Sequence, residues 1–326
     1  MSKFGKITII AVIAVLFVVA HISTFFVGGK LVSDFAFNPK LGSTGMNVQD
    51  NITNDYLDKT DQEFKLETEW YNQTEKTLVK IETHDGLESY AVKILNTTST
   101  NKWALLLHGY RGGIGMMSSF AKNYYEKGYN LILPSLRGHA LSESKNITFG
   151  WFDRLDMLVW INEILEIDPN AQIVMHGISM GGSTVMMTTG EDLPENVKVA
   201  VSDCGYSSVY DEFHYLATDY LGIGATPILS ATDFYAKKRL GVSIKQMSAV
   251  KQLENSITPT LFIHGGADTF VPTFMIDKNF DAAVKLIDGD TKQKLVVDEA
   301  VHGMSASVDE IIYWNTVWNF IGRFVV

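Results

Sequence analysis

The chain has 326 residues, of which 46% are hydrophobic and 20% charged, enough apolar side chains for one large globular domain. The formal net charge of -10 argues against electrostatic binding of nucleic-acid phosphates, so no nucleic-acid partner is expected. The single cysteine, Cys204, excludes an intramolecular disulfide and a cysteine-rich metal site. Because Cys204 ends the apolar run 197–204, we expect it to be a small core residue.

The chain opens on an apolar stretch, Ile7–Val27, whose length of about 20 residues matches the hydrocarbon thickness of a bilayer. Lys3 and Lys6 precede it, and this positive-inside bias predicts a cytoplasmic N-terminus with the remaining chain outside. We therefore expect residues 1–29 to be a cytoplasmic tip and a single-pass membrane anchor.

The alternative for this stretch is a cleaved signal peptide and a secreted protein, because Val18-Val19-Ala20 has small residues where a signal peptidase cuts. The apolar run continues well past Ala20, which favours the anchor. An exported domain without disulfides fits a bacterial envelope, so the predicted location is the cell membrane with the folded part extracytoplasmic.

Residues 30–76 are predicted to be a polar linker that leads to a folded domain at 77–326. Within the linker, the acid-rich segment 50–69 carries apolar residues at helical spacing. This favours an amphipathic helix packed on the domain, and a solvated stalk is the alternative.

The folded domain begins with a predicted β-hairpin, because apolar and polar residues alternate over 77–83 and 89–95 around the turn Asp85-Gly86. Short continuous apolar runs then alternate with stretches of helical periodicity, which predicts an α/β fold with a mostly parallel sheet and helices on both faces. The runs are 103–107, 130–133, 172–175, 197–202, 260–263 and 294–297, and the helical stretches include 117–127, 154–167, 182–189 and 274–286.

One segment, about 206–251, interrupts this alternation. It has no clear strand, it is rich in aromatic residues, and its pattern indicates two or three helices inserted after the strand at 197–202. Ligands in open parallel sheets bind at the carboxyl edge of the strands, so we expect this insertion to form a small helical cap over the site.

The sharpest local motif is Gly177-Ile178-Ser179-Met180-Gly181, which lies between a predicted strand and a predicted helix. A G-x-S-x-G turn in that context presents its serine at the strand end as a nucleophile. The motif alone also arises by chance, so the flanking strand and helix carry the assignment of Ser179.

Acyl transfer requires two backbone N–H groups that point at the developing oxyanion. One is expected from Met180, directly after the nucleophile, and the other from Tyr110, which follows the strand that ends in His108-Gly109.

A serine hydroxyl needs a base, and the base needs an acid that orients it. His302 follows the last predicted strand, and Asp268 lies in a glycine turn after the strand before it. The order Ser179, Asp268, His302 fits a triad. Asp203, at the end of the strand before the predicted cap, is the rival acid.

These residues and their spacing resemble the α/β-hydrolase superfamily over about residues 77–326, with the nearest likeness to bacterial membrane-anchored serine hydrolases related to the prolyl-oligopeptidase-like set. The segment Pro134–Ser142 also resembles the family's D-x-R-G-x-G-x-S loop, although Ser135 replaces the usual Asp and Ala140 the usual Gly.

The resemblance implies hydrolysis of an ester or thioester through an acyl-enzyme on Ser179, with a small-molecule ester as substrate and no cofactor. The alternatives are a peptidase that acts on short peptides and a non-catalytic binding protein on the same fold. No metal site is expected, because His108, His264 and His302 lie on separate strands without the spacing of zinc ligands.

Overall fold

Eight strands form one sheet in a computed structural model that describes residues 23, 25–41, 69–222 and 225–326. The order across the sheet is β1-β2-β4-β3-β5-β6-β7-β8, with β1 and β2 antiparallel to their neighbours and the other pairs parallel. The strands are β1 (Thr77–Glu82), β2 (Glu88–Ile94), β3 (Lys102–Leu107), β4 (Asn130–Pro134), β5 (Gln172–Ile178), β6 (Val197–Asp203), β7 (Thr260–Gly265) and β8 (Lys292–Val297).

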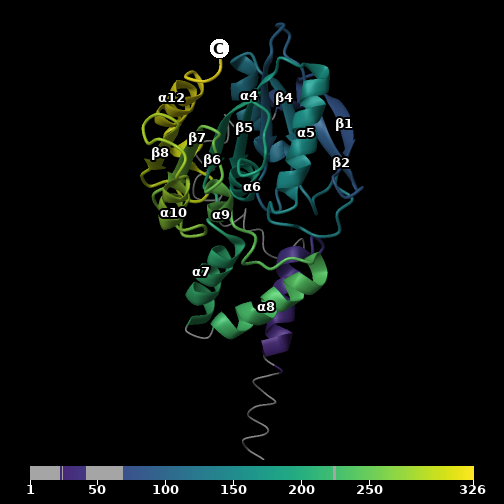
Figure 1. Cartoon of the computed structure of the whole chain (residues 1–326), viewed down its shortest axis with the longest axis vertical. Helices are drawn as coiled ribbons and strands as arrows, with labels where there is room; N and C mark the ends of the chain where they lie inside the picture. Colours follow the sequence, from purple (N-terminus) through teal and green to yellow (C-terminus); the bar gives the residue numbers. More distant parts are fainter. Residues whose placement is uncertain (1–22, 24, 42–68, 223–224) are drawn as a thin grey trace, which may run out of the picture.

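Helices cover both faces of this sheet (Figure 1). They are α4 (Ser118–Glu126), α5 (Asp153–Ile167), α6 (Met180–Thr188), α9 (Ala249–Leu253), α10 (Phe274–Ala282), α11 (Ser305–Val308) and α12 (Glu310–Ile321), with a short 3-10 helix, η1 (Ile114–Met117). The predicted α/β class, with a mostly parallel sheet between helices, is confirmed.

The apolar core is split by the sheet into two clusters. On β3, Leu105 faces the cluster that α5, α6, α9 and α10 close, whereas Leu106 faces the cluster closed by α4 and α12. Both side chains are fully buried, which explains why the central strands are continuous apolar runs and do not alternate with polar residues.

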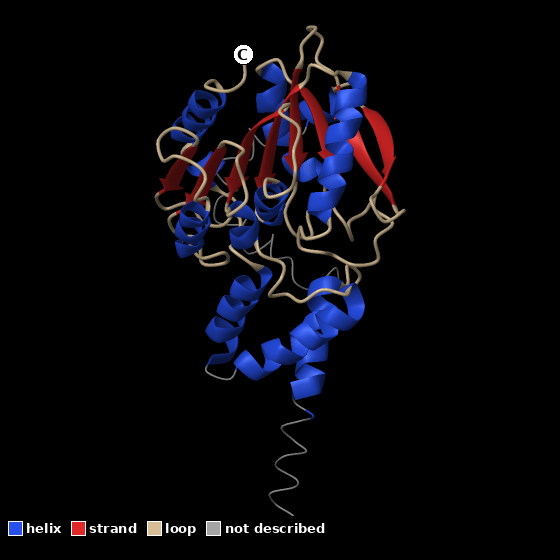
Figure 2. Ribbon diagram, in the orientation of Figure 1, coloured by secondary structure: helices blue, strands red, loops and turns tan. Residues whose placement is uncertain are grey.

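Two further helices, α7 (Val209–Leu221) and α8 (Ala225–Leu240), lie beyond the carboxyl ends of the strands, next to a helix at residues 25–37 (Figure 2). The helix at 25–37 falls partly inside the predicted linker, yet Ser33, Ala36 and Phe37 are buried. The part of the predicted linker that this helix occupies is therefore packed on the folded domain through residue 37.

The predicted anchor at 7–27 and the amphipathic segment at 50–69 lie almost entirely outside the described residues. Among the helices that are described, none has the length and apolar character needed to cross a bilayer.

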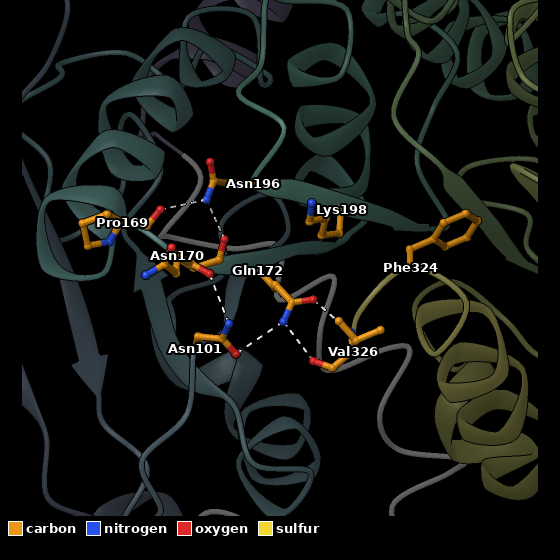
Figure 3. Close-up of a pocket in the computed structure, with 9 residues that line it drawn as sticks. Asn101, Pro169, Asn170, Gln172, Asn196, Lys198, Phe324 and Val326 are labelled. Atoms are coloured by element: carbon orange, nitrogen blue, oxygen red, sulfur yellow. Dashed lines mark hydrogen bonds between the residues drawn. The ribbon is translucent and has the colours of Figure 1, made fainter.

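At the amino edge of the parallel strands, a hollow is lined by amide side chains (Figure 3). Gln172 donates to the Asn101 side-chain oxygen at 3.3 Å and to a terminal oxygen of Val326 at 2.9 Å, and it accepts from the Val326 N–H at 2.9 Å. The Asn101 amide donates in turn to the Asn170 carbonyl at 3.2 Å. These side-chain amides satisfy one another's hydrogen bonds and hold Val326 in place. The residues that line this hollow therefore have a structural role.

A buried polar chain crosses the second core cluster. The Tyr124 hydroxyl lies 3.0 Å from His176 Nδ1, His176 Nε2 lies 3.1 Å from the Tyr313 hydroxyl, and that hydroxyl donates to Asp203 at 2.9 Å. Since the Tyr313 proton is given to Asp203, its oxygen accepts from Nε2–H, and Nδ1 accepts from Tyr124. Burial lowers the pKa of His176 to about 3, in agreement with a neutral ring.

This burial predicts an acid-sensitive fold. His176 and His108 both have a pKa of about 3, lowered first by burial, whereas an unfolded histidine titrates near about 6.5. As pH falls from about 6.5 toward about 3, these two histidines bind protons in the unfolded chain but not in the folded chain. The free energy of unfolding should then drop by about 1.4 kcal/mol per pH unit for each histidine.

Urea unfolding between pH 7 and pH 5 measures this slope. His176→Gln should make the slope shallower by about one proton, because one of the two buried imidazoles is gone. An unchanged slope in His176→Gln would contradict the assignment.

Candidate active site

Ser179 lies in the sharp turn between β5 and α6, and its backbone adopts φ 56° and ψ −119°. A left-handed φ costs a non-glycine residue about 1–3 kcal/mol, so other contacts must hold it. The Ser179 N–H donates to the Asp203 carbonyl at 2.8 Å, and its carbonyl accepts from Ser183 at 2.9 Å. The turn is thereby tied to the end of β6 and to the first turn of α6.

The glycines of the motif permit this turn to pack. A side chain on Gly177 would overlap the backbone of Gly181, and one on Gly181 would overlap the carbonyl of Leu107 at the end of β3. The G-x-S-x-G spacing therefore reflects two backbone approaches that leave no room for a Cβ.

The three residues predicted as a triad meet beside this turn. His302 Nε2 lies 2.8 Å from Ser179 Oγ, and His302 Nδ1 lies 2.7 Å from Asp268 Oδ2. An ionised Asp268 accepts the proton of Nδ1, which leaves Nε2 free to accept from the serine hydroxyl. The arrangement has the donor and acceptor order that a serine nucleophile requires.

Asp268 is held in its ionised form. Burial alone would raise its pKa, but hydrogen bonds from His264 and His302, together with their charge, outweigh burial and lower it to about 2. The N–H groups of Phe270 and Val271 also donate to Oδ1, at 2.9 and 3.0 Å. His264 Nε2 lies 3.3 Å from Asp268 Oδ2 and so helps to fix the acid.

The rival acid, Asp203, faces another direction. Its carboxyl oxygen Oδ2 accepts from the Tyr313 hydroxyl at 2.9 Å, while its backbone carbonyl supports the Ser179 turn. Burial, the largest effect, raises the pKa of Asp203. The His302 ring is thus held by Asp268.

Cys204 follows directly and is fully buried. Its sulfur lies within 4.8 Å of a ligand atom of Asp268 and of His302, close enough to form a candidate metal group. Burial raises the pKa of the thiol well above its usual range, and Asp268 and His302 are hydrogen-bonded to each other. Cys204 therefore packs as a neutral thiol behind the triad.

The two predicted oxyanion donors, the N–H groups of Met180 and Tyr110, belong to segments that adjoin Ser179. Met180 is the first residue of α6, where an N–H has no partner within the helix. A Cβ on Gly109 would lie 3.4 Å from Ser179 Cβ, so the loop that carries Tyr110 runs directly beside the nucleophile.

Two histidines cross-link this loop to the loop after β4. His108 Nε2 accepts from the Leu136 N–H at 3.1 Å, and His139 Nε2 accepts from the Arg111 N–H at 2.9 Å. Each Nδ1 faces a backbone carbonyl, so Nε2 is the bare nitrogen. Burial lowers the pKa of both rings and keeps them neutral acceptors.

Arg137 fixes the segment Pro134–Ser142, which resembles the D-x-R-G-x-G-x-S loop. Its buried guanidinium pairs with Asp156 and Asp85, both at 2.6 Å, and lies 3.3 Å from His84. The second candidate metal group in the described chain, His84 with Asp85 and Asp156, is thus already occupied by this cation. The arginine performs a structural role at some distance from Ser179.

Comparisons with known proteins place this architecture. A family model described as alpha/beta hydrolase fold matches residues 103–227, and with the eight-stranded sheet it establishes the α/β-hydrolase fold for this chain. The α/β-hydrolase fold expected from the sequence is thereby confirmed. Among curated proteins, the chain is 23% identical over 260 residues to the uncharacterized protein YqkD of Bacillus subtilis (strain 168), which covers 78% of this chain and 81% of that protein.

Solved structures with the same fold include esterases and peptidases. The Pyrococcus furiosus esterase Pf2001 matches 78% of this chain and 92% of its own, with a TM-score of 0.63 and 18% identity. A Mycobacterium tuberculosis puromycin-hydrolyzing peptidase matches 77% of this chain and 39% of its own, with a TM-score of 0.59 and 17% identity. The Pyrococcus horikoshii acylaminoacyl peptidase matches 76% and 41%, with a TM-score of 0.53 and 19% identity.

Proposed function

We propose that this protein is a serine hydrolase that cleaves an ester-type bond through an acyl-enzyme on Ser179. One observation carries the proposal: the continuous hydrogen-bonded chain from Asp268 through His302 to Ser179, with 2.7 and 2.8 Å between the atoms. The esterase and peptidase neighbours agree with a hydrolase on this fold.

In the proposed mechanism, Ser179 Oγ attacks the substrate carbonyl while its proton passes to His302 Nε2. The oxyanion accepts from the N–H groups of Met180 and Tyr110. The bond to the leaving group then breaks, and the leaving oxygen takes the proton from His302. A water molecule, deprotonated by the same Nε2, then attacks the acyl carbon. The bond from that carbon to Ser179 Oγ breaks, Oγ regains the proton from His302, and the acid is released. Asp268 stabilises the imidazolium in both halves.

An aromatic cluster next to the loop that carries Tyr110 supports an apolar acyl group as substrate. The Tyr110 ring stacks on Phe149 at 5.1 Å, and Phe149 contacts Phe213 of α7 at 5.3 Å and Phe37 at 5.3 Å. Four segments of the chain thus meet in one apolar cluster beside the loop that carries Tyr110.

A second candidate, peptide hydrolysis, is favoured by Glu212 on α7. This residue is 4% exposed, and neither carboxyl oxygen has a hydrogen-bond partner among the described residues. Burial, with a smaller effect from Asp268, raises its pKa well above the usual range. A substrate ammonium group would supply the missing partner, as the N-terminus of a short peptide does.

The nucleophile is tested with a fluorophosphonate probe. The wild type should be labelled and Ser179→Ala should not, because only an activated serine reacts. Ser230→Ala, on the exposed side of α8, is the matched control and should label normally. Equal labelling of wild type and Ser179→Ala would disprove the assignment.

Turnover of a p-nitrophenyl ester separates the two acids. Asp268→Asn should lower kcat by roughly four orders of magnitude, since His302 loses the partner that fixes its tautomer. Asp203→Asn should reduce kcat much less, and the reverse ranking would make Asp203 the acid.

Substrate class is tested by comparing p-nitrophenyl esters with aminoacyl p-nitroanilides. Esters of neutral acyl groups should be turned over with the higher kcat/KM, and Glu212→Gln should leave that value within about threefold. If the anilides are preferred and Glu212→Gln lowers only their kcat/KM, by about tenfold or more for a lost buried ion pair, the peptidase is the function.

We further propose that the domain is tethered outside the cytoplasm by residues 7–27. The basic residues before this stretch support the orientation. The helix at 25–37, which overlaps the end of this stretch, supports contact with lipid, because Phe26, Val27 and Leu31 are 41%, 58% and 64% exposed.

Protease added to intact bacterial cells should remove the domain while a cytoplasmic marker stays intact. Protection of the domain until lysis would rule out this topology. Release of the domain into the medium, without protease, would instead indicate cleavage after the apolar stretch.

A further inference from the structure

The helix at 25–37 ends against the loop that carries the expected oxyanion donor. The Arg111 guanidinium donates to the Phe35 carbonyl at 2.6 Å, and the Tyr110 hydroxyl donates to the Ala36 carbonyl at 2.9 Å. Carbonyls in the last turn of a helix have no partner within the helix and form its negative end. A cation and a hydroxyl from the loop therefore satisfy two groups that the helix leaves open.

Contacts with aromatic rings reinforce the attachment of the helix at 25–37 to the loop after β3. The Arg111 guanidinium lies 4.4 Å from the centre of the Phe35 ring and 4.9 Å from that of the Tyr110 ring. One residue further, Phe37 is fully buried, and its carbonyl accepts from the Ile147 N–H at 2.9 Å. The end of the helix is thus inserted between the loop after β3 and the loop after β4.

The helix itself is fixed on its other side by α8. Asp34 pairs with Arg239 at 2.6 Å, and a side chain on Gly29 would overlap Ala231, so the two helix backbones lie in close contact. Phe26 and Phe234 add an edge-to-face contact at 6.2 Å. A helix held by α8 can in turn hold the loop.

The loop needs such support. Arg111 has φ 54°, a left-handed conformation that costs a non-glycine residue about 1–3 kcal/mol. The preceding Gly109 lies against Ser179, so relaxation of Arg111 would move the Tyr110 N–H relative to the nucleophile. An oxyanion donor is effective only when it is fixed at hydrogen-bond distance from the developing charge.

We propose that the helix at 25–37 is a positioning element of the active site, and that Tyr110 and Arg111 are positioning residues through their bonds to the Phe35 and Ala36 carbonyls. The inference rests on the proposed acyl transfer at Ser179. It makes the segment N-terminal to the predicted hydrolase domain part of the machinery that stabilises the oxyanion.

The test uses the full chain with Arg111→Met, which keeps the length of the side chain and removes its charge and donors. We expect kcat for a p-nitrophenyl ester to fall about 10- to 100-fold. This is no larger than the fall in kcat that follows removal of a whole oxyanion donor. KM should change less than threefold, because the ground-state substrate does not use the oxyanion position. The inhibition constant of a boronic acid, which forms a tetrahedral adduct with the serine, should rise in step with the fall in kcat.

Three variants complete the design. Arg111→Lys retains a cation and should recover part of kcat, whereas Tyr110→Phe keeps the ring, loses the bond to Ala36 and should show a smaller loss than Arg111→Met. Arg323→Met removes an arginine that binds the carbonyls of Gly289 and Asp290, far along the chain from this attachment, and should behave like the wild type.

If Arg111→Met and Tyr110→Phe fold and keep kcat within twofold of the wild type, the inference is overturned. A parallel rise in KM without a loss of kcat also overturns it, because that pattern indicates substrate binding. Should Arg111→Met fail to fold, Tyr110→Phe and Arg111→Lys decide by the same criteria. A wild type that no fluorophosphonate labels would disprove the proposed function instead, so the two failures are distinct.

Discussion

The close approach of backbone to backbone at the Ser179 turn is the constraint on which the site depends. Three chain segments, the ends of β3 and β5 and the start of α6, meet where Gly177 and Gly181 leave no space for a side chain. The serine is held in a left-handed conformation by a hydrogen bond to β6. With Ser179 fixed in this way, Asp268 and His302 of the proposed triad are each positioned by a loop that follows a strand of the same sheet.

Neutral buried histidines provide much of the surrounding rigidity. His108 and His139 accept from backbone N–H groups of each other's loops, and His176 joins two tyrosines behind the sheet. A cationic residue at these positions would have no acceptor for its charge, and an aliphatic residue would leave buried N–H groups unpaired. A neutral imidazole offers one donor and one acceptor, which is what these positions require.

Much of the fold was predictable, because strands buried on both faces are continuous apolar runs and the helices between them show their own period. The triad of Ser179, Asp268 and His302 could also be predicted from the sequence, because each residue follows a recognisable strand. By contrast, His139 and His264 carried no signal beyond a histidine near glycine. Their partners are a backbone N–H and a carboxylate brought close only by the three-dimensional fold.

The helix at 25–37 was missed for a related reason. Its sequence is mixed, its buried residues Ser33, Ala36 and Phe37 cover a narrow stripe, and the groups it binds are carbonyls, which every residue has. Any residue type can accept a hydrogen bond through its backbone carbonyl, so the sequence does not indicate which residues do so. The detectable half of the contact is Arg111, whose role depends on a partner 76 positions away.

The distances along the chain have a consequence for how the proposed site is assembled during synthesis. The site joins Phe35 to Arg111, and Ser179 to His302, over separations of 76 and 123 residues. Contacts between such distant segments form late in folding, because the entropy cost of closing a long loop comes before the contact can stabilise the chain. A partly synthesised chain therefore contains the proposed nucleophile without its proposed base. The proposed activity would arise only when β8 and the loop after it have emerged and docked.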